Sequence, residues 1–127
     1  MAPQPGDYTV TKQRFSAFFA TDLDIILRGL GTKNVYLTGT QYPNCIRSTA
    51  LDSMSLDYNT IVVTDCCSAA SEDVAKANIY DLQNMGIACV TVGKVCVDGI
   101  GVGGGIGNQD SQIAKYIVDT FNQLINV

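Results

Sequence analysis

The chain has 127 residues, of which 46% are hydrophobic and 16% charged, and its formal net charge is −4. This length fits one ordinary domain with a sizeable buried core. The negative net charge and the lack of any run of Lys and Arg argue against a nucleic-acid or anionic-membrane partner. No apolar run reaches the length of a membrane span, and the first residues lack the features of a signal peptide.

Five cysteines and no histidine limit the chemistry that this chain can perform alone. Without His, histidine-based acid–base catalysis and mixed Cys/His zinc sites are excluded within the chain. The cysteines form an odd set without regular metal-ligand spacing, so the sequence predicts no metal site and no cofactor. A reduced, cytoplasmic environment is the simplest interpretation.

The first third of the chain predicts a short strand, a helix and a buried strand. Residues 7–11 are β-prone and predict the short strand. Thr21 is expected to be the N-cap of the helix, with Asp24 completing a capping box and Gly31 ending the helix. Residues 35–37 predict a buried strand that stops before a tight turn.

The remaining elements alternate between helices and strands. Apolar residues recur at helical spacing over residues 44–56, and the β-branched run 60–65 predicts a strand covered on both faces. Ser71 is expected to cap a helix that ends at Gly86, and residues 87–92 predict another buried strand. This order predicts a Rossmann-like three-layer α/β/α fold with a parallel sheet and right-handed crossovers.

We predict a single domain over residues 1–127. Within it, residues 99–127 are expected to form a glycine-rich linker and a C-terminal amphipathic helix. The glycine run lacks the pattern of a phosphate-binding loop.

The strand, tight turn and helix around Cys45 mark it as a candidate nucleophile. The thiol is expected in the first turn of a helix, where unpaired backbone N–H groups and the helix dipole favour a thiolate. The alternative is an inert buried thiol, because cysteine is among the most buried residue types. The placement alone leaves both interpretations open.

Two linked motifs resemble those of the isochorismatase-like cysteine hydrolases, a family that includes nicotinamidases and N-carbamoylsarcosine amidases. The motifs are Val10–Asp24, which contains Lys-Gln-Arg-Phe-Ser-Ala-Phe-Phe, and Leu37–Ala50, which contains Thr-Gly-Thr-Gln-Tyr-Pro-Asn-Cys. The similarity extends over about residues 5–92. Two motifs at a family-like separation are more specific than either one alone.

The resemblance implies roles for several residues. Members usually carry an aspartate–lysine–cysteine triad, in which Lys12 takes the place of the lysine and Cys45 that of the nucleophile. The family's oxyanion hole maps to the backbone N–H groups of Gln41 and Cys45. A non-proline cis peptide, often found in the family, maps to Thr40–Gln41.

Three further side chains are candidates for a substrate pocket, each with a plain structural alternative. Phe18 and Tyr42 are candidate walls for a planar substrate, although Phe18 is better explained as a core residue. Arg47 is a candidate partner for a substrate carboxylate, with a salt bridge to a neighbour such as Asp52 as the alternative. The adjacent pair Cys66-Cys67 is interpreted as packing residues rather than a redox pair.

The family's catalytic aspartate lies at the end of a first strand in the middle of the sheet, and this chain begins after that region. We therefore expect a sheet that is incomplete at its N-terminus, and a homo- or hetero-oligomeric partner that completes it. The metal ligands of nicotinamidase-type members are likewise expected in the preceding region.

The implied function is hydrolysis of a small amide or related C–N substrate through a thioester, with Asp supplied by another chain or segment. The alternatives are a non-catalytic scaffold or interaction subunit of the same fold and, with less support, a thiol redox protein.

Overall fold

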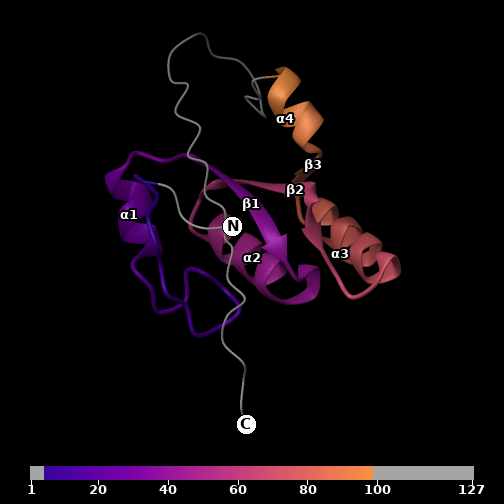
Figure 1. Ribbon diagram of the computed structural model, residues 1–127, viewed down its shortest axis with the longest axis horizontal. Coiled ribbons are helices and arrows are strands. Elements are labelled where there is room, and N and C mark those ends of the chain that lie inside the picture. Colours follow the sequence, from indigo (N-terminus) through magenta and orange to yellow (C-terminus); the bar gives the residue numbers. More distant parts are fainter. Residues whose placement is uncertain (1–4, 99–127) are drawn as a thin grey trace.

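The computed structural model describes residues 5–98, which form four helices and three strands joined by short connections (Figure 1). In chain order the elements are α1 (Leu23–Gly29), β1 (Asn34–Thr40), the π-helical turn η1 (Tyr42–Ile46), α2 (Arg47–Ser55), β2 (Asn59–Ser68), α3 (Glu72–Asn84), β3 (Ala88–Val90) and α4 (Val92–Asp98). The linker and helix expected over residues 99–127 lie outside the described residues.

The three strands form a parallel sheet in the order β1-β2-β3, which confirms the α/β class. Leu37 pairs with Val62, whereas Gly39 pairs with Cys67, so the register shifts near the carboxyl end of β1. The last predicted strand is shorter than expected, because Ala88–Val90 is followed almost directly by α4.

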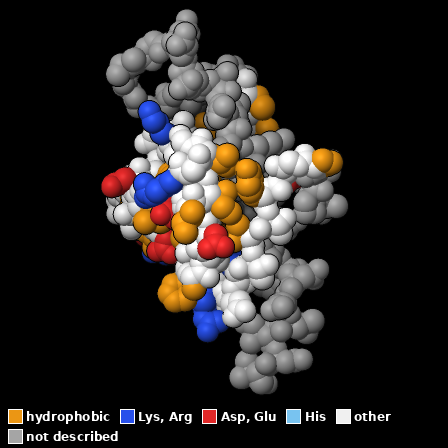
Figure 2. All heavy atoms as spheres, turned by 90° about the vertical axis from the view of Figure 1, so that its left-hand side faces the viewer, with side chains coloured by type: hydrophobic (Ala, Val, Ile, Leu, Met, Phe, Trp, Pro, Cys, Tyr) orange, Lys and Arg blue, Asp and Glu red, His pale blue; other side chains and the backbone are white. Residues whose placement is uncertain are grey.

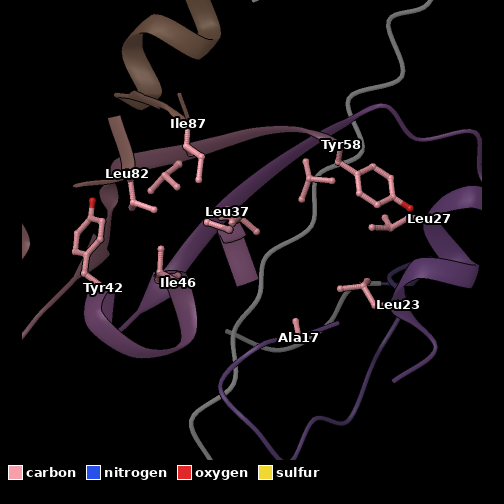
Figure 3. Packing of buried hydrophobic residues seen from close by; sticks show 12 residues of the cluster. Ala17, Leu23, Leu27, Leu37, Tyr42, Ile46, Tyr58, Leu82 and Ile87 are labelled. Atoms are coloured by element: carbon pink, nitrogen blue, oxygen red, sulfur yellow. The ribbon is translucent and has the colours of Figure 1, made fainter. Parts of the chain in front are cut away.

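One hydrophobic cluster joins the sheet to its helices (Figure 3). Leu37 lies in its middle, and alternate residues of β1 and β2 point into it, as a strand's period of two requires. The cluster includes residues of α1, α2 and α3, so these helices share one face of the sheet. The described residues thus provide the sheet and one helical layer of the predicted three-layer arrangement. Its members are Ala17, Leu23, Leu27, Val35, Leu37, Tyr42, Ile46, Ala50, Tyr58, Val62, Leu82 and Ile87.

The strand β2 is buried over four consecutive residues, 60–63, as its β-branched run predicts for a strand covered on both faces. The helix α3 also begins and ends as expected. Ser71 accepts a hydrogen bond from the Val74 N–H, and Gly86 follows the helix with a φ of 92°.

Two predictions for the N-terminal part are wrong. Residues 7–11 form no strand, because β-prone residues need a neighbouring strand for their backbone groups. Thr21 is not the N-cap of α1; Asp22 occupies that position and makes no capping bond with its side chain. The Thr21 hydroxyl donates to the Ala17 carbonyl at 2.5 Å and accepts a hydrogen bond from the Leu23 N–H at 3.3 Å.

Figure 2 shows the side of the molecule that carries α1, with apolar side chains gathered among charged ones. Several large apolar residues of this helix and the segment before it are exposed, namely Tyr8, Phe15, Phe19, Ile25 and Leu30. Across residues 5–98, the helices are all too short or too polar to cross a membrane.

Candidate active site

Cys45 lies in the π-turn between the carboxyl end of β1 and the start of α2, rather than in the first turn of α2 itself. The Gln41 carbonyl accepts hydrogen bonds from the N–H groups of Asn44, at 3.1 Å, and Ile46, at 3.3 Å, which closes the turn around the cysteine. The peptide bond between Thr40 and Gln41 is cis, as expected. Cys45 is 6% exposed, so its sulfur lies just below the surface.

Lys12 and Cys45 are brought together from positions 33 residues apart. The distance from Lys12 Nζ to Cys45 Sγ is 3.3 Å. The same ammonium donates to the carbonyls of Arg14, at 3.0 Å, and Phe15, at 3.2 Å. An ammonium has three N–H donors, so these three acceptors fix its position. A positive charge at this distance attracts negative charge that develops on the sulfur.

A contact that sequence reasoning missed joins the loop that follows Lys12 to the helix that follows Cys45. The Ala17 N–H donates to Thr49 Oγ1 at 3.0 Å, and Thr49 is fully buried in α2. A signal for it was present in the sequence: Thr49 is a polar residue one helical turn after Cys45, on the side of α2 that carries the apolar Ile46 and Ala50.

The structure places Tyr42, a predicted pocket wall, in the hydrophobic core. Its side chain is 1% exposed, and its hydroxyl donates to the Thr64 carbonyl at 3.1 Å. Burial raises the pKa of Tyr42, with nearby Cys67 adding to the shift. Phe18 stacks on Tyr58 with a ring-centroid distance of 5.8 Å and packs against the core, in line with its structural alternative.

Arg47 is occupied by an ion pair, so a free guanidinium for a substrate carboxylate is not available in this structure. Its partner is Asp81 of α3 rather than Asp52, at 2.6 Å from Arg47 Nη1 to Asp81 Oδ2. Asp81 is within reach because α3 packs against the turn η1, which directly precedes Arg47.

The other cysteines differ in their surroundings. Cys67 packs against the core, and burial raises its pKa to about 11. Burial also raises the pKa of Cys89. Both members of the pair were predicted to be packing residues. Cys67 fits this prediction, whereas Cys66 is exposed and does not.

The described residues 5–98 offer no donor set for a metal of the nicotinamidase type. The chain has no His, and residues 5–98 hold no cluster of three or more Cys, Asp or Glu that could bind an ion. No step of the chemistry below is therefore routed through a metal.

Comparisons with known proteins show which proteins this chain is similar to. The isochorismatase domain model matches residues 1–94. The chain is 42% identical over 93 residues to a probable inactive nicotinamidase from Arabidopsis thaliana, covering 72% of this chain and 47% of that protein. It is 39% identical over 84 residues to a maleamate amidohydrolase from Pseudomonas putida, covering 66% of this chain and 39% of the relative.

Among solved structures, an isochorismatase family protein from Desulfovibrio vulgaris superposes with a TM-score of 0.74 at 46% identity, covering 78% of this chain and 52% of that one. The chain thus spans less than half the length of the two curated relatives. Since the family model covers most of its residues, the chain belongs to the isochorismatase family.

Proposed function

We propose that this chain supplies the cysteine half of an active site that hydrolyses a small amide. The observation that carries the proposal is the 3.3 Å contact between Lys12 Nζ and Cys45 Sγ. Membership of the family, and a relative named as an amidohydrolase of maleamate, support a small amide as the substrate class.

In the proposed reaction, the Cys45 thiolate attacks the amide carbonyl carbon and a tetrahedral oxyanion forms. Backbone N–H groups of Gln41 and Cys45 stabilise this oxyanion, and such donors contribute roughly 3–4 kcal/mol in other enzymes. The C–N bond breaks, the nitrogen takes a proton and leaves as ammonia or an amine, and a thioester remains. Water then hydrolyses the thioester to a carboxylic acid and restores the thiol.

Lys12 has an electrostatic part in this scheme. Its ammonium favours the thiolate before attack, and its two loop carbonyls hold it beside the sulfur. An aspartate from another chain or segment removes the proton from Cys45 and delivers a proton to the leaving nitrogen. A carboxylate beside an ammonium stays ionised and can accept that proton.

The alternative is a non-catalytic subunit that keeps the fold and the Lys12–Cys45 contact. One observation favours it: the Arabidopsis thaliana relative is named as probably inactive. A subunit of this kind would bind a partner through the same sheet and helices, without turnover.

Selective alkylation of Cys45 tests the proposed chemistry. We expect iodoacetamide to label Cys45 near neutral pH faster than an ordinary thiol of equal access, because the Lys12 ammonium lies beside its sulfur. Dividing the rate near neutral pH by the plateau rate at high pH corrects for access. The rates are measured by mass spectrometry of the peptides from the full chain.

Lys12→Met is the decisive variant for this experiment, because it keeps a side chain of similar length and removes the charge. We expect it to lower the normalised rate at Cys45 to that of an ordinary thiol. Exposed Cys66 serves as the internal reference in both chains. A wild-type Cys45 that reacts like Cys66 after normalisation would contradict the catalytic proposal and favour the non-catalytic alternative.

A further inference from the structure

The loop that carries Lys12 is attached to the helix that follows Cys45 by a buried hydrogen bond. The Ala17 N–H donates to Thr49 Oγ1 at 3.0 Å, and the two residues are 4% and 1% exposed. A buried backbone N–H needs an acceptor, because losing its water without one costs free energy. Here the acceptor is a side chain from a different element of the fold.

The position of this loop decides where the Lys12 ammonium lies. Lys12 Nζ donates to the carbonyls of Arg14 and Phe15, both in the loop that leads to Ala17. Cys45 lies in η1, two residues before the start of α2, and Thr49 lies in the first turn of α2. The loop and α2 are thus connected at one point by the Ala17–Thr49 bond and at another by the contact between Nζ and Sγ.

We propose that Thr49 is a positioning residue, whose hydroxyl sets the distance between the Lys12 ammonium and the Cys45 sulfur. The proposal rests on the proposed function, since it concerns how reactive Cys45 becomes. Thr49 acts through the loop, because its hydroxyl accepts from the Ala17 N–H. When its hydroxyl is lost, the loop is free to move away from α2 and the ammonium moves with it. The attraction between charge and sulfur then weakens with distance and with the water that enters.

The test measures alkylation of Cys45 by iodoacetamide in the full chain, as the rate near neutral pH divided by the plateau rate at high pH. This ratio reports thiolate formation and cancels changes in access. We expect Thr49→Val, which keeps the shape and removes the acceptor, to lower the ratio about fivefold. We expect Thr49→Ser, which keeps the hydroxyl, to restore the wild-type ratio.

Ser53→Ala is a matched control from the same helix. Ser53 is fully buried, and its Oγ accepts a hydrogen bond from Thr60 Oγ1 at 2.8 Å, away from the Lys12 loop. We expect this variant to lower the urea midpoint, as Thr49→Val does, and to leave the ratio unchanged. A ratio that falls equally in both variants would show general loosening and would overturn the positioning role.

A double variant separates this proposal from the proposed function. If Thr49 acts through Lys12, then Lys12→Met combined with Thr49→Val gives the same ratio as Lys12→Met alone. A further fall in the double variant contradicts the proposal. If Lys12→Met lowers the alkylation ratio but Thr49→Val leaves it at the wild-type value, the positioning role of Thr49 is overturned and the proposed function stands. If Lys12→Met leaves the alkylation ratio unchanged, the proposed function is overturned.

Hydrogen exchange provides a second measurement if the valine variant does not fold. In the wild-type chain, the Ala17 amide should exchange as slowly as the amides of α2, because its acceptor is part of that helix. Exchange as fast as that of the exposed loop amides would overturn the proposal.

Discussion

At the scale of single residues, the thiols of this chain differ in their surroundings. Cys45 has an ammonium 3.3 Å from its sulfur. Cys67 has mainly apolar neighbours, and although hydrogen bonds from Gly39 and Tyr42 oppose the effect, burial raises its pKa to about 11. The same residue type is therefore a candidate nucleophile at one position and an inert packing group at another.

The buried thiol of Cys67 predicts a loss of stability at alkaline pH. An unfolded thiol ionises near its ordinary pKa of 9.0, whereas the folded one keeps its proton up to about 11. Between these values the unfolded state binds fewer protons, so the free energy of unfolding falls as the pH rises, by on the order of 1 kcal/mol per pH unit. Urea unfolding at a series of pH values measures this slope.

Cys67→Ala should flatten that slope, because it removes the group that ionises on unfolding. Cys66→Ala is the matched control, since Cys66 is the adjacent cysteine and its side chain is exposed. If both variants keep the wild-type slope, Cys67 is not the origin of the alkaline loss.

At the scale of elements, α1 depends on contacts with the segment between α2 and β2. The Tyr58 hydroxyl donates to Asp24 Oδ1 at 2.7 Å, and the Arg28 guanidinium lies 5.3 Å from the centre of the Tyr58 ring. The hydrogen bond from Tyr58, followed by that from Arg28, lowers the pKa of Asp24. A helix of only 7 residues is not stable alone, so such tertiary contacts maintain it.

Tyr58→Phe should destabilise the chain by about 1 kcal/mol near neutral pH, because it removes one hydrogen bond to a charged acceptor. A lowered carboxyl pKa stabilises the fold above the unfolded value of 3.8, and this contribution is lost as the pH falls through the folded value. The difference between wild type and variant should therefore shrink below about pH 3.8.

Tyr80→Phe serves as the control in the same urea titrations. It makes the same chemical change on an exposed residue of α3, so it should leave stability unchanged at every pH. A cost of Tyr58→Phe that stays constant as the pH falls would assign the loss to packing rather than to Asp24.

Elements whose signals are local were predictable from the sequence. The run 60–63 formed a strand covered on both faces, and Ser71 and Gly86 bounded a helix as expected, because capping and turn chemistry act within a few residues. The N-cap prediction for Thr21 is wrong by one residue: Asp22 is the N-cap, although the Thr21 hydroxyl still accepts a hydrogen bond from the Leu23 N–H at the start of α1.

The candidate site was predictable only where the family motifs cover it. Those motifs placed Lys12 beside Cys45 and a cis peptide at Thr40–Gln41. Tyr42 and Arg47 are close to Cys45 in sequence, yet the first packs into the core and the second pairs with Asp81. The orientation of each side chain is set by its contact with β2 or α3. These contacts join residues far apart in the sequence, so a local sequence pattern does not predict them.

At the scale of the whole molecule, the sheet places the candidate site at its margin. β1 is an edge strand of the described sheet, and the turn with Cys45 follows its carboxyl end. Parallel sheets are normally covered on both faces and are interior structures. Three parallel strands with helices α1–α3 on one face form a sheet with few strands and one helical layer. The chain covers less than half the length of the two curated relatives, which is consistent with this small size.

We therefore predict that the chain works in an assembly in which a second copy or a different chain extends the sheet beside β1. Native mass spectrometry and sedimentation of the purified chain should show such an assembly. Addition of the partner should slow hydrogen exchange in β1, since new ladder bonds protect its amides. Exchange in α3, which lies away from that edge, is the internal reference. A monomer whose β1 amides are already as protected as those of β2 would contradict this prediction, because an edge strand that is fully protected in isolation needs no partner.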